Sequence, residues 1–179
     1  MTRAFVAVRP PDGVLDAVEA LVGALDVPDA RWTDRDQWHV TLQFLGNRAD
    51  VDAVAAALAP LAVHAGNVRF GGVGAFPTPR RARVVWLGVA TGEPLLAQLA
   101  ACVAVLLRPL GFEPEGRAYH PHLTLARCKT PTDVRAATDA FATAEVGAPW
   151  TAGEVVVYES TRGRAGARYT PRATLTLPR

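Results

Sequence analysis

Two short motifs of the same form, His-x-Thr, are the residues of this chain best suited to catalysis. They are His39 with Thr41 and His122 with Thr124. An imidazole has an ordinary pKa near 6.5, so it can take up or release a proton at neutral pH. A threonine hydroxyl can donate a hydrogen bond to a phosphate oxygen. Together the four side chains predict acid–base chemistry at a phosphorus atom, with no metal and no cofactor.

Each motif lies in a segment where polar and apolar residues alternate, as in a half-buried strand. Side chains two apart on a strand point to the same face, so His39 and Thr41 should share one face with Gln43. His122 and Thr124 should share a face in the same way. An in-line displacement needs a base for the attacking oxygen and an acid for the departing one, and each typically contributes about 10²–10⁴ in rate.

The two motifs belong to a longer internal repeat. His39 and His122 are 83 residues apart, and so are Asp50 and Asp133, each of which precedes a predicted helix. Two similar halves tend to pack about an approximate twofold axis, which would bring the two motif strands together. The repeat predicts a single domain over 1–179, made of two interleaved lobes with approximate repeats 1–80 and 81–179. In both halves a strand, an amphipathic helix, the motif strand and a second helix follow in order. In the first half these are 3–8, 14–25, 38–45 and 51–61. In the second half they are the strand 83–89, a helix that opens at 91–94, carries its buried face over 95–107 and stops at Gly111, the strand 122–127 and a helix that starts at 133–137.

Composition sets broad limits on function. The chain has 179 residues, is 50% hydrophobic and carries a formal charge of +2, which permits a phosphate-bearing partner without requiring one. No stretch approaches the length of a membrane span. Two cysteines, Cys102 and Cys128, are too few for a disulfide framework or a cysteine zinc site. These features predict a soluble cytoplasmic protein that does not bind membranes.

The two other histidines offer an alternative to metal-free chemistry. His120 precedes His122 by two residues, so a His-x-His zinc pair is conceivable. No third ligand has matching spacing, and we therefore predict no metal site. His64 is predicted to lie on the surface.

A single His-x-Thr motif is weak evidence for a catalytic site, whereas two such motifs at equivalent places in a repeat are not expected by chance.

The segments around both motifs resemble the 2H phosphoesterase superfamily, and specifically its RNA 2',3'-cyclic phosphodiesterase branch, also called 2'-5' RNA ligase. The resemblance implies an α+β, bilobal, pseudo-twofold duplicated fold, in which two antiparallel sheets line a central cleft and helices pack outside. It covers nearly the whole chain and rests on residues 3–8, 38–46, 83–89 and 120–127, with Glu159-Ser160 and Arg168-Tyr169 near the end.

The resemblance also implies an activity and roles for individual residues. The activity is hydrolysis of 2',3'-cyclic phosphate ends to 2'-phosphomonoesters, with reversible joining of tRNA halves through a 2'-5' linkage in vitro. His39 would be the acid for the departing 3' oxygen and His122 the base for water, although a pseudo-symmetric site could run in either direction. Thr41, Thr124 and Arg127 would hold the phosphate. Expected partners are RNA ends or small cyclic nucleotides, with no obligatory protein partner and a monomeric chain.

Phe44 matches a family position at which an aromatic ring stacks on the nucleobase. Phe44 and Arg127 each follow their histidine by five residues, so simple strand alternation puts them on the wrong face. Because the offset is the same in both halves, we expect one irregularity in each strand, such as a bulge. The alternative is a buried Phe44 and a merely solvated Arg127.

Two arginine-rich segments could guide an RNA backbone, or could simply be solvated. They contain Arg80, Arg81 and Arg83 in one case and Arg162, Arg164 and Arg168 in the other. Two further readings of the whole chain stay open. One is a non-catalytic module that binds RNA or nucleotides. The other is a phosphodiesterase that acts on another cyclic nucleotide or on a 2'-5' oligonucleotide.

Overall fold

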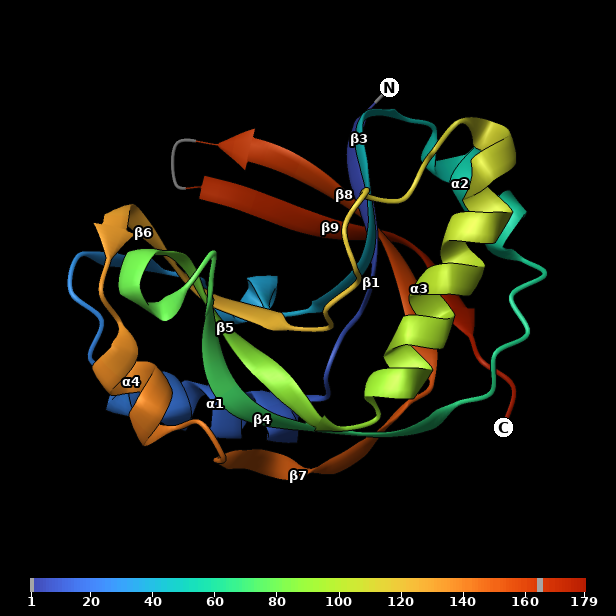
Figure 1. Cartoon of the computed structure of the whole chain (residues 1–179). Coiled ribbons are helices and arrows are strands. Elements are labelled where there is room, and N and C mark those ends of the chain that lie inside the picture. The colour runs from blue at the N-terminus through green and yellow to red at the C-terminus, as the bar shows by residue number, and fades with distance from the viewer. Residues whose placement is uncertain (1, 164–165) are drawn as a thin grey trace.

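One strongly curled antiparallel sheet organises the chain (Figure 1). The computed structural model describes residues 2–163 and 166–179. The sheet runs in the order β7-β4-β5-β6-β3-β1-β8-β9, and the short β2 pairs with β6 beside this path. The strands are β1 Thr2–Val8, β2 Ala30–Trp32, β3 Val40–Ala49, β4 Gly66–Phe76, β5 Ala82–Thr91, β6 Leu123–Thr132, β7 Glu145–Ala152, β8 Glu154–Gly163 and β9 Gly166–Thr176.

The motif strands β3 and β6 lie at the centre of the sheet, where they join its two halves. They pair antiparallel through Val40 and Leu123. On one side of this junction lie β1, β8 and β9, and on the other lie β5, β4 and β7. The predicted α+β class with antiparallel strands is confirmed, and the two expected sheets are joined into one through β3 and β6.

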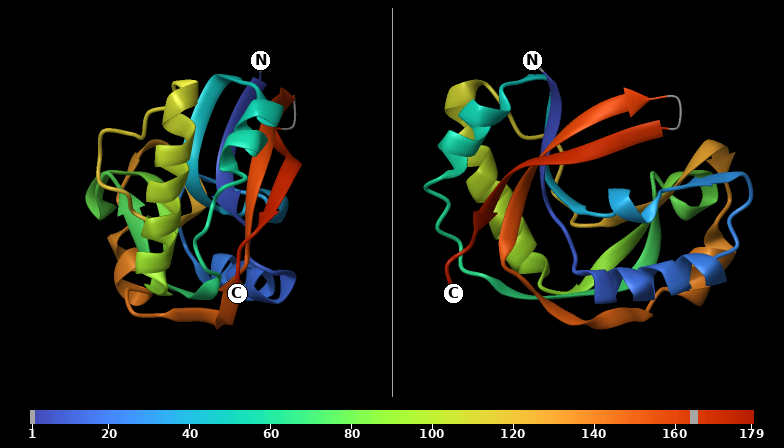
Figure 2. Two further views of the ribbon diagram at one scale, coloured as in Figure 1. Left: turned by 90° about the vertical axis from the view of Figure 1, so that its right-hand side faces the viewer. Right: turned by 180° about the vertical axis from the view of Figure 1, so that it is seen from behind.

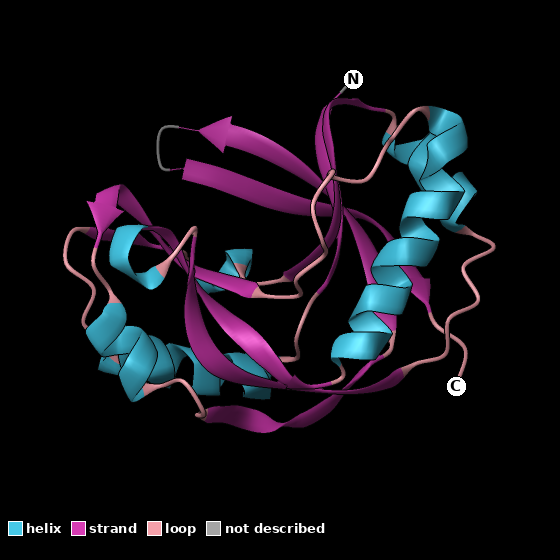
Figure 3. Cartoon of the chain, viewed as in Figure 1, coloured by secondary structure: helices cyan, strands magenta, loops and turns pink. Residues whose placement is uncertain are grey.

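Helices cover the two ends of the sheet (Figures 2 and 3). They are α1 Asp12–Ala24, α2 Val51–Leu58, α3 Glu93–Leu107 and α4 Arg135–Ala140, with 3-10 turns at Arg35–Gln37, Pro79–Arg81 and Arg108–Leu110. Helix α3, from the second half of the sequence, contacts β3, whereas α1, from the first half, contacts β7. This exchange of helices is what two interleaved lobes would produce.

Two of the predicted helix starts are shifted: α1 begins at Asp12, two residues before the expected position 14, and α4 begins later than expected. Asp50 caps α2, because its carboxylate accepts hydrogen bonds from the backbone N–H groups of Asp52 and Ala53 at 3.1 and 3.2 Å. Asp133 accepts from the backbone N–H of Arg135 at 3.1 Å, and α4 begins at that residue, two positions later than expected.

Helix α3 corrects the expectation that no segment is long enough to cross a membrane. Glu93–Leu110 spans 18 residues with a mean hydropathy of 1.5, which meets that criterion by length and composition. Its fully buried residues, among them Leu96, Leu99 and Val103, belong to the main hydrophobic core. A third of that window is buried inside the protein.

Candidate active site

Each motif strand contains a bulge at the same place in the repeat. Along the pairing of β1 with β3, Thr41 faces Ala7 and Gln43 faces Val6, so Leu42 is the extra residue. Along the pairing of β5 with β6, Thr124 faces Trp86 and Ala126 faces Val85, so Leu125 is the extra residue. The predicted irregularity is therefore present in both strands, and the two extra leucines are again 83 residues apart.

The bulges decide which side chains face the cleft. Past the bulge Phe44 lies opposite Phe5 and is 52% exposed, so the alternative of a buried Phe44 is wrong. Arg127 occupies the equivalent position opposite Val84 and is exposed. The same shift turns Gln43 inward, where it is 6% exposed and its amide donates to the carbonyl of Phe112 at 3.3 Å. The expectation that Gln43 shares the face of His39 is therefore wrong.

The pairing of Val40 with Leu123 brings the two motifs side by side. Continued by one residue in each direction, this antiparallel register would set His39 opposite Thr124 and Thr41 opposite His122. The two histidines would then be diagonal neighbours on one face, roughly 7–8 Å apart, and the charge of His122 does act on the pKa of His39. That gap can hold one phosphate group between the rings. Thr41 and Thr124 border the gap from the two strands.

Both histidines are oriented by the same backbone contact. The Nδ1 atom of His39 lies 2.6 Å from the carbonyl oxygen of Gln37, and that of His122 lies 2.7 Å from the carbonyl oxygen of His120. A carbonyl only accepts, so Nδ1 carries the proton in both neutral rings and Nε2 is left for chemistry. The Nε2 atom of His39 lies 3.0 Å from the hydroxyl oxygen of Thr41.

Burial disfavours the protonated form of both imidazoles. Burial lowers the pKa of His39 to about 4, helped by the charges of His122, Arg9 and Arg127 and opposed by the bond to the Gln37 carbonyl. Burial also lowers the pKa of His122, and the charges of His120, Arg117 and Arg127 act in the same direction. Arg127 thus acts on both rings, as expected for a side chain beside the gap.

An aromatic cluster supports His39 from one side of the cleft. Phe5 stacks on the imidazole with ring centres 4.6 Å apart, and Tyr169 meets the same ring edge-on at 5.4 Å. Phe5 also stacks on Tyr158 at 5.2 Å and lies 6.2 Å from Phe44. Phe44 is therefore connected to His39 through one intervening ring.

A second aromatic cluster lies around His122. Phe76 meets the imidazole edge-on at 5.1 Å, and the indole of Trp86 lies 6.2 Å from it. Trp86 also lies 4.7 Å from the ring of His120. From the loop before β6, the hydroxyl of Tyr119 donates to the backbone carbonyl of Thr41 at 2.9 Å. Thr41 is the residue that immediately precedes the extra Leu42.

Sequence reasoning missed Phe5, Trp86, Tyr119 and Tyr169. For Trp86 a signal was present in the predicted strand 83–89, because alternation puts its side chain on the face opposite to Val85 and Leu87. Both of these neighbours are completely buried in the structure. Phe5 comes to His39 through the pairing of β1 with β3, and Tyr169 comes through the pairing of β9 with β8 and of β8 with β1. Local sequence does not specify these pairings. Tyr119 lies in a loop, where spacing carries no directional information.

The other predicted polar residues lie around the cleft or away from it. His64 is exposed in the loop between α2 and β4, as predicted. Within residues 2–163 and 166–179, no three His, Cys, Asp or Glu side chains gather as metal ligands would. Arg80, Arg81 and Arg83 are exposed around the start of β5, and Arg162 and Arg168 are exposed near the tip of the β8–β9 hairpin. Arg164 lies outside the described residues.

Comparison with known proteins shows the family to which the chain belongs. A family model described as the 2'-5' RNA ligase superfamily matches residues 10–164. A protein of Aeropyrum pernix named RNA 2',3'-cyclic phosphodiesterase is 38% identical over 96 residues, 52% of this chain and 54% of that protein. Proteins of the same name from Archaeoglobus fulgidus and Methanothermobacter thermautotrophicus are 34% and 35% identical over 130 and 137 residues. These matches cover 71% and 72% of this chain and 73% and 72% of the two proteins. The match thus spans about half the length of the Aeropyrum relative.

Solved structures with the same fold cover almost the whole chain. A crystal structure described as a phosphoesterase superposes with a TM-score of 0.81 at 25% identity and covers 99% of both chains. Escherichia coli LigT complexed with 3'-AMP gives the same values. The protein TT0787 of Thermus thermophilus superposes with a TM-score of 0.78 at 25% identity over 97% of both chains.

Proposed function

Because the chain belongs to the 2'-5' RNA ligase superfamily, we propose that it hydrolyses 2',3'-cyclic phosphate ends of RNA by acid–base catalysis between His39 and His122. It is an RNA 2',3'-cyclic phosphodiesterase, an enzyme of the 2H phosphoesterase type. The observation that carries this proposal is the pairing of Val40 with Leu123. An antiparallel register through this pair would set one imidazole on each side of a phosphate-sized gap.

In this mechanism His122 takes the proton of the attacking water through Nε2. The phosphorus–oxygen bond to the ribose 3' oxygen breaks, and His39 gives its Nε2 proton to that oxygen. The product is a 2'-phosphomonoester. Thr41 and Thr124 donate to the non-bridging oxygens and hold the phosphate in line, as preorganised donors do for developing charge. Arg127 adds a positive charge on the same side.

The substrate anion also supplies a charge that raises the proton affinity of the site. Both rings are neutral in the free enzyme, since burial lowers the pKa of each. A bound phosphate raises the pKa of a nearby imidazole, because an opposite charge favours the protonated form. Binding therefore loads the acid with its proton as the site fills.

Phe44 is the proposed stacking surface for the terminal nucleobase. Its ring is 52% exposed, and it lies next to Phe5, which in turn stacks on His39. Base stacking on an aromatic ring tolerates any base, so this contact suits many RNA ends. Exposed arginines near the cleft are proposed to attract the RNA backbone through charge; they are Arg80, Arg81, Arg83, Arg162 and Arg168.

We also propose that the enzyme works in the cytoplasm as a monomer.

The test is hydrolysis of a 2',3'-cyclic nucleotide by purified protein in excess chelator, with the product identified. The expected product is the 2'-phosphate alone. His39→Ala and His122→Ala should each lower the rate by about 10²–10⁴, while His64→Ala, at an exposed loop histidine, should not. A 3'-phosphate product would refute the role of His39, and tight binding without turnover would favour a non-catalytic module. Loss of activity in chelator would point to metal binding at His120 and His122.

A further inference from the structure

The indole of Trp86 forms an aromatic surface next to His122 that hydrolysis of a cyclic phosphate does not use. Trp86 lies opposite Thr124 across β5 and β6, so it borders the phosphate gap. Its other cross-strand partner is Gly74 on β4. A Cβ atom at that position would overlap two carbons of the indole. The glycine therefore lets the indole lie across the sheet.

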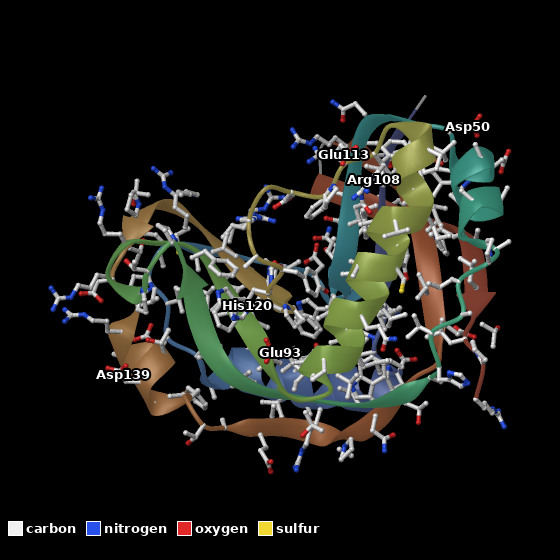
Figure 4. All side chains as sticks on the ribbon, turned by 45° about the vertical axis from the view of Figure 1, so that its right-hand side comes forward. Asp50, Glu93, Arg108, Glu113, His120 and Asp139 are labelled. Carbon is white, nitrogen blue, oxygen red and sulfur yellow. The ribbon has the colours of Figure 1, made fainter. Side chains whose placement is uncertain are left out.

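A small cavity opens beside this indole. Its volume is about 240 Å³, and its lining includes Trp86, His120, Glu93 and Gly88. Glu93 begins α3, and Figure 4 shows it near His120 on the side of β5 that faces that helix. Pockets for drug-sized ligands have about 300–1,000 Å³, so this one suits a single ring system. Indole and imidazole rings with a carboxylate at the edge are groups that recognise a nucleobase.

The two aromatic clusters lie on opposite sides of the gap. Phe44 is connected to His39 through Phe5, whereas Trp86 lies beside His122. In the proposed mechanism His122 takes the proton from the oxygen that attacks phosphorus. A nucleoside bound at Trp86 would therefore present its own oxygen, instead of water, to His122.

We propose that Trp86, His120 and the adjoining cavity form a subsite for the nucleoside that carries a free 5' hydroxyl when the enzyme makes or breaks a 2'-5' linkage. This inference rests on the proposed function. In the joining direction the 5' oxygen attacks phosphorus, its proton passes to His122, and the bond to the 3' oxygen breaks as His39 protonates that oxygen. In the cleaving direction the 3' oxygen attacks, His39 takes its proton, and His122 protonates the departing 5' oxygen. The products are then a 2',3'-cyclic phosphate and a nucleoside.

The experiment compares two reactions of the same protein. One is hydrolysis of a 2',3'-cyclic mononucleotide, which has no second nucleoside. The other is cleavage of a 2'-5'-linked dinucleoside monophosphate, followed in kcat/KM. Trp86→Leu should lower cleavage about 5- to 100-fold more than it lowers hydrolysis, the range expected for loss of one stacked base. Gly74→Ala should act in the same direction, because it displaces the indole without removing it.

Phe44→Leu is the matched control. The nucleoside at Phe44 takes part in both reactions, so this variant should lower both by a similar factor. A second readout uses the cleavage reaction alone and does not compare cleavage with hydrolysis. In this readout the departing nucleoside of the dinucleotide is replaced by an abasic ribose. The wild type should cleave this abasic substrate as slowly as Trp86→Leu cleaves the normal dinucleotide. On the abasic substrate, Trp86→Leu should be little slower than the wild type.

The outcomes separate this inference from the function on which it rests. If the wild type hydrolyses the cyclic nucleotide but Trp86→Leu lowers both reactions equally, the subsite is refuted while the phosphodiesterase stands. The same holds if Phe44→Leu, rather than Trp86→Leu, lowers cleavage selectively. If the wild type carries out neither reaction, the proposed function itself fails.

Discussion

Val40 and Leu123 face each other across β3 and β6, and they are equivalent residues of the internal repeat. The approximate twofold axis therefore passes through this pair. Its consequence is that the two motifs, their backbone contacts and their bulges are arranged in the same way in both halves. His39 corresponds to His122, the carbonyl of Gln37 corresponds to that of His120, and the bulge at Leu42 corresponds to that at Leu125.

The symmetric pair predicts a particular pH dependence. Catalysis needs one protonated and one neutral imidazole, yet the pKa of His39 is about 4 and that of His122 is lowered from 6.5. The singly protonated free enzyme is therefore most abundant below pH 6.5, and kcat/KM should peak there and decline above it. Bound substrate raises both pKa values, so the optimum of kcat should lie at higher pH. A kcat/KM optimum above pH 7 would contradict these environments.

His39 should also make the fold sensitive to acid. Its folded pKa of about 4 is below the value near 6.5 of an unfolded chain, so the unfolded state binds more protons between these two pH values. The free energy of unfolding therefore falls as pH drops from 6.5 toward 4. His39→Gln should reduce that loss by roughly 1–2 kcal/mol, once partial exposure of the ring is allowed for. Urea denaturation at pH 7.0, 5.5 and 4.5 measures the effect.

The control for acid sensitivity is His64→Gln, at an exposed residue of the loop before β4. It should follow the wild-type pH dependence. Equal behaviour of His39→Gln and the wild type would show that the imidazole of His39 is not buried in solution.

Much of the site could be predicted because it is local. The sequence itself shows the His-x-Thr spacing and the 83-residue offset. It also shows that Phe44 and Arg127 would lie on the wrong face of a regular strand. From these features a bulge was predicted in each motif strand, and both bulges are present. The position of Gln43 could not be predicted by alternation. A bulge reverses every side chain beyond it, and alternation alone does not say at which residue the bulge lies.

Strands β4 and β7 were not predicted. Gly66–Phe76 contains four glycines, which lower strand propensity. At two of them glycine is required because another part of the fold lies very close to the backbone. The glycine at 74 makes room for the indole of Trp86, and at Gly71 a Cβ atom would lie 2.7 Å from the backbone oxygen of Ala144. Such close approaches depend on segments distant in sequence, so composition alone does not indicate these strands.

Tyr119 is predicted to be a positioning residue. Its hydroxyl bonds to the carbonyl of Thr41 just before the bulge, and so helps to hold that side chain toward the phosphate gap. Tyr119→Phe should cost about 0.5–1.5 kcal/mol of stability, the usual worth of one hydrogen bond. It should also lower kcat several-fold with little change in KM. Chemical denaturation and steady-state kinetics on a cyclic nucleotide measure the two effects.

Thr138→Val separates positioning from stability. Thr138 is buried in α4, away from the motifs, and its hydroxyl donates to the carbonyl of Arg135 at 3.1 Å. The variant should lose comparable stability and keep the wild-type kcat. If Tyr119→Phe also keeps the wild-type kcat, its hydrogen bond has only a structural role.

Arg127 is predicted to act on both substrate binding and proton affinity. Its charge lowers the pKa of His39 and of His122. Arg127→Gln should therefore raise both pKa values and move the kcat/KM optimum to higher pH. Loss of a charged phosphate contact should also raise KM for a cyclic nucleotide about tenfold or more.

The matched variant for Arg127 is Arg83→Gln, which removes an exposed charge from the neighbouring strand β5. It should leave the pH optimum for a cyclic mononucleotide nearly in place, because the charges with the largest effect on the pKa values of the two histidines include Arg127 and do not include Arg83. If the two variants shift the optimum equally, the effect comes from net charge. If Arg127→Gln raises KM without moving the optimum, its guanidinium contacts the phosphate but lies too far from the imidazoles to set their proton affinity.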